Sequence, residues 1–187
     1  MTGLGNRTLA LERIGHALVR RERYGGDLAV LFVDLDRFNL VNDNLGHDAG
    51  DELLCVVADR LTTSVRATDS VARVAGDEFV VICDELDRPD EAQVIAHRIL
   101  SSLQEPVDLA GERVRVRGSI GIAFAHGDTD TAEDLLRDAA AAMYRAKESG
   151  RAQVAAFDDS MRQRLRNELH MEREIAECLD RGELRVW

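Results

Sequence analysis

The alternation of apolar and polar positions along the chain predicts a regular succession of helices and strands. Apolar residues recur at helical spacing in several segments, which is typical of helices that bury one face. Helices are predicted over residues 8–23, 51–64, 89 to about 103, and 131–148. Apolar or alternating runs predict strands over residues 28–33, 70–74, 79–83, 114–125 and 153–157.

The order of these elements indicates one sheet with helices packed on it. Helices lie between mostly neighbouring strands, so they can cover the faces of a common sheet. Residues 28–33 are continuously apolar, as in a strand that is buried on both faces. The short spacing between residues 70–74 and 79–83 is typical of a tight hairpin. We therefore expect an α/β (α+β) fold.

The segment from residue 159 onward has a different character. It is rich in charge, and its apolar residues Met161, Leu165, Leu169 and Ile175 recur at helical spacing. This pattern predicts an exposed connecting helix over residues 160–180.

Composition narrows the classes of function. The 187 residues include 35 acidic and 24 basic side chains, for a net charge of −11. This acidic excess argues against nucleic acid as a partner. The scattered cysteines Cys55, Cys83 and Cys178 are interpreted as reduced. Neither a signal peptide nor an apolar stretch of membrane-spanning length is visible, so we expect a cytoplasmic domain, even if a longer parent protein is membrane-anchored.

The predicted hairpin carries two adjacent carboxylates, Asp77 and Glu78, at its tip. Carboxylates held close together repel each other unless a cation lies between them. A divalent metal, with a phosphate-bearing substrate, is therefore one hypothesis for this turn. A solvated acidic turn is the alternative.

A second acidic cluster follows the buried strand. Asp34 and Asp36 come directly after the apolar run at residues 28–33. Carboxylate oxygens are ligands that Mg²⁺ prefers. If the hairpin lies beside this strand, Asp34 and Asp77 meet at a single ion. The alternative is that the aspartate caps a following helix.

Several motifs in the same order resemble those of the GGDEF domain, the catalytic unit of diguanylate cyclases. The resemblance covers roughly residues 2–158, and residues 73–79 contain its signature as Ala75-Gly76-Asp77-Glu78-Phe79. The other matching motifs are Thr2-Gly3-Leu4-Gly5-Asn6-Arg7, Asp34-Leu35-Asp36-Arg37-Phe38, Asn42-Asp43 with Gly46-His47 and Gly50-Asp51, Ser119-Ile120-Gly121-Ile122-Ala123, and Ala142-Met143-Tyr144-Arg145-Ala146-Lys147 with Gly150-Arg151.

The resemblance implies a fold and a reaction. The fold would be a ferredoxin-like core, shared with nucleotidyl cyclases, with a mainly antiparallel central sheet. The reaction would condense two GTP into cyclic di-GMP and release pyrophosphate. Each domain binds one GTP in this family, so catalysis requires a homodimer. Metal ions carry much of the electrostatic stabilisation in such phosphoryl transfers.

The resemblance also implies the ligands of the metal and the group that acts on the nucleophile. Asp34, Asp77 and the main-chain carbonyl of Leu35 would bind Mg²⁺ or Mn²⁺. Glu78 would lie next to the ribose 3′-hydroxyl that must lose its proton. Asp77 and Glu78 are thus the implied catalytic residues.

The implied substrate contacts come from four other segments. The base readers would be Asn42 and Asp51, a carboxylate being a natural acceptor for the N–H groups of guanine. Lys147 and Arg151, one helical turn apart, would meet the phosphates, although both could simply be cations at a helix C-terminus. Asn42 and Asp51 could likewise be helix caps. The remaining implied substrate-binding residues are Phe38 and Asn39, in a turn with free backbone N–H groups, and Ala75 and Gly76 of the signature.

Three positions depart from the family pattern. Ala75 replaces the first glycine of the signature, which is unfavourable if that position has a positive φ. Asn39 replaces a lysine, which removes a cation near the triphosphate. Ala139-Ala140 replaces an Ala-Asp pair and is interpreted as a structural change. The first two substitutions are expected to reduce activity.

Arg66 and Asp69 form an RxxD motif that ends shortly before the signature. It resembles the inhibitory site of many diguanylate cyclases, where arginine can bind a guanine or a phosphate of cyclic di-GMP. The alternative is a surface Arg–Asp pair, which contributes little.

The C-terminal residues 181–187 resemble the first strand of an EAL phosphodiesterase domain. We therefore expect a GGDEF domain at residues 1–158, and a connecting helix with the start of a truncated EAL-like domain at 159–187. Three hypotheses of function remain: an active diguanylate cyclase, a GTP-binding regulatory module for a neighbouring EAL domain, or a receptor for cyclic di-GMP.

Overall fold

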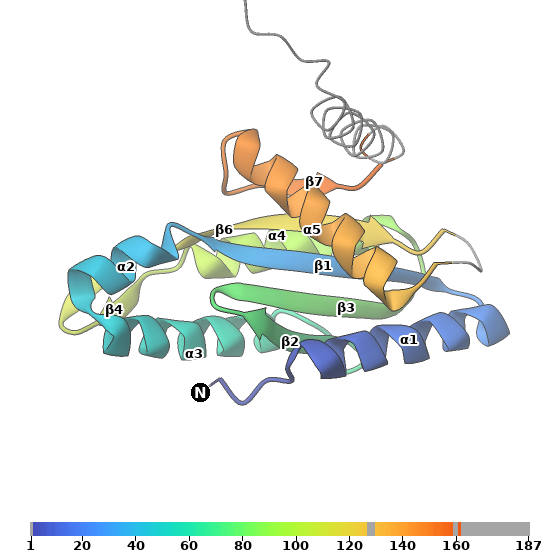
Figure 1. Ribbon diagram of the computed structural model, residues 1–187, viewed down its shortest axis with the longest axis horizontal. Helices are drawn as coiled ribbons and strands as arrows, with labels where there is room; N and C mark the ends of the chain where they lie inside the picture. Colours follow the sequence, from blue (N-terminus) through green and yellow to red (C-terminus); the bar gives the residue numbers. More distant parts are fainter. Residues whose placement is uncertain (1, 127–129, 159–160, 162–187) are drawn as a thin grey trace, which may run out of the picture.

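The computed structural model describes residues 2–126, 130–158 and 161 (Figure 1). The helices are α1 (Arg7–Tyr24), α2 (Phe38–Leu45), α3 (His47–Thr63), α4 (Asp90–Leu103) and α5 (Ala132–Glu148). The strands are β1 (Asp27–Asp36), β2 (Ser70–Ala75), β3 (Glu78–Leu86), β4 (Val107–Leu109), β5 (Glu112–Val114), β6 (Arg117–Phe124) and β7 (Val154–Ala156). Within the described residues, no helix is both long enough and apolar enough to span a membrane.

Five of the strands form one sheet in the order β2-β3-β1-β6-β7. β1 pairs antiparallel with both β3 and β6, β2 pairs antiparallel with β3, and only β7 runs parallel to its neighbour β6. The predicted α+β fold with a mainly antiparallel central sheet is confirmed. β1 is the middle strand, and its residues 28–35 are buried, as the continuous apolar run predicts.

Helices cover both faces of the sheet. The core on one face contains side chains of α3 and α4 together with the odd-numbered residues Leu31, Val33 and Leu35 of β1. The core on the other face contains side chains of α1 and α5 together with the even-numbered Val30 and Phe32. Figure 1 shows α5 crossing in front of β1 and β6, with α4 behind them. Asp34, also even-numbered, continues the row of side chains on the α1/α5 face.

Gly121 allows α5 to lie unusually close to β6. A Cβ atom at this position would overlap the carbonyl oxygen of Ala139 and the backbone nitrogen of Met143, and would lie 2.8 Å from the carbonyl carbon of Ala142. Ala139 and Ala142 are themselves fully buried. Small residues on both elements thus fix the distance between helix and strand, and with it the place where the last turn of α5 ends.

Several elements differ from the sequence-based expectations. α2 was not predicted as a separate helix, and α3 begins four residues before the expected start at residue 51. The strand expected over residues 114–125 is divided, because β5 ends at Val114 and β6 begins at Arg117. Valine and arginine continue to alternate across this break. The alternation therefore predicted one continuous strand and gave no sign that the strand is interrupted. The small sheet of β4 and β5 has strands of three residues, too short to show a period. The expected connecting helix and EAL-like start, at residues 159–187, lie outside the described residues, apart from Met161.

Candidate active site

The two acidic segments lie side by side at one end of the sheet. In the pairing of β1 with β3, Asp34 is directly opposite Glu78. The backbone N–H of Leu35 donates a hydrogen bond to the carbonyl oxygen of Asp77 at 3.4 Å. Asp34 is buried, whereas Asp77 and Glu78 are half-buried. The structure therefore brings together Asp34, Leu35, Asp77 and Glu78 at one point, and it does not place Asp34 at a helix N-cap, a position that Arg37 occupies before α2.

The hairpin between β2 and β3 turns over Gly76 and Asp77. In this turn Gly76 has a positive φ, at 40°, whereas Ala75 does not. The strain considered for an alanine at position 75 therefore does not arise. The side chain of Arg73 braces the turn, because its Nε donates to the carbonyl oxygen of Gly76 at 2.8 Å. Val74 is an extra residue between paired positions, and such a bulge bends the strand near the turn.

Lys147 approaches the same point from the last turn of α5. Its Nζ lies 2.6 Å from Oδ1 of Asp34. Burial raises the pKa of the Asp34 carboxyl above its ordinary value, Lys147 opposes this rise, and the nearby carboxylates of Asp77 and Glu78 add to it. The site thus holds several negative charges in a partly buried place, where positive charge is strongly stabilising.

Asp36 links the end of β1 to the turn that carries Arg151. Ser119 Oγ donates to Oδ1 of Asp36 at 2.9 Å, and the backbone N–H of Ala152 donates to Oδ2 at 3.0 Å. Arg151 and Ala152 both have positive φ, at 63° and 51°, which is unfavourable for residues other than glycine. The Asp36 carboxylate therefore helps to hold a strained turn in place. No pattern along the chain indicates this role of Asp36, because both of its partners are distant in the sequence.

Replacing Asp36 by alanine is expected to lower the free energy of unfolding by about 2 kcal/mol, since two hydrogen bonds to a charged acceptor are lost. Asp36→Asn should lose less than half of that, because its amide oxygen can accept from Ala152 while its NH₂ group donates to Ser119. Urea denaturation of the three proteins measures this difference. Equal stability of the wild type and Asp36→Ala would show that the contact is unimportant.

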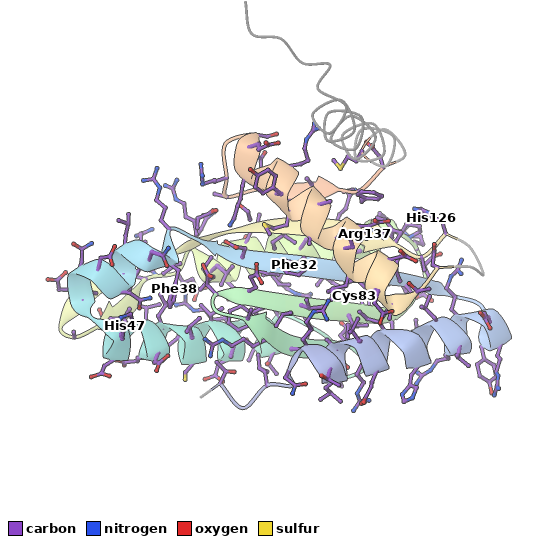
Figure 2. All side chains as sticks on the ribbon, in the orientation of Figure 1. Phe32, Phe38, His47, Cys83, His126 and Arg137 are labelled. Carbon is purple, nitrogen blue, oxygen red and sulfur yellow. The ribbon has the colours of Figure 1, made fainter. Side chains whose placement is uncertain are left out.

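A left-handed residue precedes α2 and shapes the turn at residues 36–39. Arg37 has φ 60° and ψ 34°. The first backbone N–H groups of a helix have no partner within the helix. The N–H of Leu40 donates to the carbonyl oxygen of Arg37 at 3.0 Å, so the groups of α2 that can bind an anion are those of Phe38 and Asn39. The side chain of Phe38 is buried, and that of Asn39 is exposed. Phe38 begins α2 and His47 begins α3 at the same end of the molecule (Figure 2).

Asn42 on α2 packs against α3 next to Asp51. A Cβ atom at Gly50 would overlap Oδ1 of Asn42 and would lie 3.3 Å from Cζ of Phe38. Gly50 therefore leaves the space that the Asn42 side chain fills, and Asp51 follows it on α3 with an exposed side chain. Neither Asn42 nor Asp51 is a helix cap, since both lie inside their helices.

The RxxD residues form a turn of their own between α3 and β2. Oδ2 of Asp69 accepts a hydrogen bond from the backbone N–H of Arg66 at 2.8 Å. The Arg66 guanidinium pairs with Glu91 of α4 at 2.9 Å, and 48% of the arginine side chain is exposed. Burial raises the pKa of the Asp69 carboxyl. The motif is thus not a simple Arg–Asp side-chain pair.

The donor set at the end of β1 fits a hard divalent cation. Among the described residues, no three side chains of His, Cys, Asp or Glu form a group that could hold an ion by themselves. Mg²⁺ is usually held by only one or two carboxylates, and waters and substrate phosphates complete its coordination. Asp34 and Asp77 supply two carboxylates at neighbouring positions, which satisfies this requirement.

Comparisons with known proteins agree with the motifs. The family model described as "Diguanylate cyclase, GGDEF domain" matches residues 1–153. Two relatives from Pseudomonas aeruginosa PAO1 are the cyclic di-GMP phosphodiesterase NbdA and the bifunctional diguanylate cyclase/cyclic di-GMP phosphodiesterase MucR. NbdA is 37% identical over 100% of this chain and 24% of its own length, and MucR is 39% identical over 98% of this chain and 27% of its own length. The chain therefore spans about a quarter of each of these relatives.

Solved structures show the same fold. The GGDEF domain of PA1120, named TpbB or YfiN, from Pseudomonas aeruginosa superimposes with a TM-score of 0.83 at 39% sequence identity. That match covers 88% of this chain and 96% of the other.

Proposed function

Because the chain belongs to the GGDEF domain family of diguanylate cyclases, we propose that it condenses two GTP molecules into cyclic di-GMP and releases pyrophosphate. The observation that carries this proposal is the junction of β1 with the hairpin. There Asp34 lies opposite Glu78, the Leu35 N–H bonds to the Asp77 carbonyl, and Lys147 reaches Asp34. Two carboxylate segments and one ammonium group at the exit of a strand form a suitable place for a metal-bound triphosphate.

Asp34, Asp77 and the carbonyl of Leu35 would hold the Mg²⁺ or Mn²⁺ ion. When bound, such an ion neutralises charge on the phosphates and lowers the pKa of the attacking hydroxyl. Glu78, which lies opposite Asp34 in the sheet, would accept the proton of the ribose 3′-hydroxyl. The 3′-oxygen of one GTP would then form a bond to the α-phosphorus of the other, and the bond to pyrophosphate would break. The same displacement with the roles of the two nucleotides exchanged would close the ring and release the second pyrophosphate.

The cationic and amide groups around this point would orient the triphosphate. Lys147 would bind the phosphates, and Arg151 would reach them from the turn that Asp36 holds. The backbone N–H groups of Phe38 and Asn39 supply neutral donors at the start of α2. Fixing the phosphate chain in this way favours in-line attack.

Guanine would be recognised between α2 and α3. The Asp51 carboxylate can accept from N1–H and N2–H₂ of the base, and Asn42 can both donate and accept. Gly50 is required between them, because any side chain there would displace Asn42.

Two domains must face each other, since each would bind one of the two GTP molecules. Incubation of the purified protein with GTP and Mg²⁺ is expected to yield two pyrophosphates for each cyclic di-GMP formed. Turnover per protein should rise with protein concentration as dimers form. Tight binding of GTP without any product would contradict catalysis.

A second candidate is a GTP-binding regulatory module that controls an adjacent EAL phosphodiesterase domain. Asn39 favours it, because a cation expected beside the triphosphate is absent from that position. The name of NbdA, a cyclic di-GMP phosphodiesterase, also favours it. The same proposal includes a domain boundary at residue 158, followed by a connecting helix and the start of an EAL-like domain.

The two departures from the family motif are expected to differ in effect. Asn39→Lys should raise kcat/KM for GTP about fivefold, which corresponds to roughly 1 kcal/mol from an added cation near the phosphates. Ala75→Gly should change it by less than about twofold, because Ala75 has no positive φ to relieve. Steady-state kinetics of both variants checks this ranking. A larger gain from Ala75→Gly would reverse it.

We further propose that cyclic di-GMP inhibits the enzyme at the RxxD turn. The guanidinium of Arg66 is half exposed and would exchange its bond with Glu91 for one with the ligand. In calorimetry, Arg66→Ala should weaken cyclic di-GMP binding about 50-fold or more, equal to roughly 2.3 kcal/mol.

Glu91→Gln provides a matched control for this site. It removes the competing carboxylate but keeps Arg66, so binding should be equal or tighter. Equal binding of cyclic di-GMP to the wild type and Arg66→Ala would remove the inhibitory role of this motif.

A further inference from the structure

A wide cleft lies beside α2, on the side where β5 leads into β6. Its volume is about 830 Å³, within the usual range for pockets that bind small molecules. Residues of α2, of the segment from Glu112 to Arg117, and of the turn at residues 150–152 line it. Figure 1 shows α2 and the small β4–β5 sheet at the same end of the molecule.

Four arginines from three segments line this cleft. Arg37 precedes α2, Arg115 lies between β5 and β6, Arg117 begins β6, and Arg151 lies in the turn after α5. Only Arg151 has a role in the proposed reaction. The concentration of positive charge is notable because the chain as a whole carries a net charge of −11.

These guanidinium groups have no partners among the described residues. Within residues 2–126, 130–158 and 161, none of the four forms an ion pair or a side-chain hydrogen bond. By contrast, Arg20, Arg66 and Arg137 each pair with carboxylates elsewhere.

The four arginines of the cleft outnumber its acidic groups. The lining contains two carboxylates, Asp36 and Glu112. Both oxygens of Asp36 already accept hydrogen bonds, from Ser119 and Ala152. Cations gathered in a concave surface attract anions and raise their local concentration.

We propose that this cleft binds a chain of two or more linked phosphates, such as that of a nucleoside polyphosphate, without a metal ion. Guanidinium groups bind phosphate oxygens in a bidentate manner, and arginines on several walls can grip successive phosphates. The apolar side chains of Leu40, Val41 and Val114 line the same cleft and offer a surface to a base. The site stands on Arg37, Arg115 and Arg117 and does not depend on the chain being a cyclase.

Isothermal titration with pyrophosphate, and separately with ATP, tests the site. The full chain is used in EDTA, so that metal-dependent binding at Asp34 and Asp77 is removed. Submillimolar binding is expected at low salt, with weakening as the salt concentration rises. The double variant Arg115→Ala/Arg117→Ala should raise Kd at least tenfold, and thermal unfolding would confirm that it is folded.

Two matched variants separate the possible sites. Arg113→Ala, on β5 but outside the lining, should leave the Kd of pyrophosphate unchanged. Asp77→Ala should also leave it unchanged, because no metal is involved. Tighter binding of ATP than of pyrophosphate would indicate that the base contacts the apolar side chains of the cleft. Equal binding would indicate that the phosphates alone provide the affinity. Both results support the site. Binding that is absent, insensitive to the double variant, or abolished by Asp77→Ala would overturn it.

Discussion

Replacing Asp77 by asparagine is expected to lower the rate of cyclic di-GMP formation on the order of 1000-fold. Asparagine has nearly the same shape, but it lacks the negative charge that a hard divalent cation requires. Loss of one metal ligand removes several kcal/mol of transition-state stabilisation, and each 1.36 kcal/mol corresponds to a factor of ten.

The fold should tolerate this substitution. Asp77 is half-buried in a turn, and the contact that joins it to β1 is made by its backbone carbonyl. The unfolding midpoint should therefore remain within a few degrees of the wild type, while product formation measured by chromatography is lost.

Asp108→Asn is the matched control, because it removes one exposed carboxylate from β4. It should retain the full rate. An Asp77→Asn protein that still forms product at more than a tenth of the wild-type rate would show that Asp77 is not a metal ligand.

Gly121→Val is expected to reduce stability by about 3 kcal/mol, the upper part of the range for overpacked cores. The new side chain would overlap backbone atoms of α5 at Ala139 and Met143, which cannot move without displacing the helix. For a domain of this size, the unfolding midpoint should fall by roughly 6–12 °C. Calorimetry measures the midpoint directly.

The same substitution should impair catalysis more than its stability effect explains. Displacement of α5 moves Lys147 away from Asp34, so GTP turnover should fall even at temperatures where the variant is folded. Gly15→Ala is the control: Gly15 lies within α1 with no atom in the way of a Cβ, so alanine should stabilise by about 0.5–1 kcal/mol. A Gly121→Val protein as stable as the wild type would show that the close helix–strand contact is unimportant.

Much of the central sheet follows from the sequence, because its strands have strong local signals. The run at residues 28–33 can only be buried, and the hairpin next to it is marked by a short turn. Adjacent placement of Asp34 and Asp77 was predicted on the condition that these strands are neighbours, and the pairing of β1 with β3 meets that condition.

The features that escaped prediction depend on contacts between distant residues or on short, polar elements. α2 is eight residues long and includes two asparagines and an aspartate near its end, so it lacks a strong helical signal. The role of Asp36 requires Ser119 and Ala152, which are far along the chain. Whether Ala75 is strained depends on its φ angle, which the sequence does not reveal. In the structure the positive φ of this turn belongs to Gly76 and not to Ala75.

The arginine cleft illustrates the same limit. Arg115 and Arg117 alternate with valines, which indicates only a strand with one polar face. Their proximity to Arg37 and Arg151 depends on how β5, β6, α2 and the turn after α5 meet. The spacing of residues within a single segment therefore could not predict that these four arginines meet.

Crystals grown with Mn²⁺ and a non-hydrolysable GTP analogue would test the metal site most directly, through the anomalous scattering of manganese. We expect one manganese ion at about 2.1 Å from carboxylate oxygens of both Asp34 and Asp77. The nucleotide's phosphates should complete its coordination. A manganese ion held by phosphates alone, with both carboxylates turned away, would contradict the proposed active site.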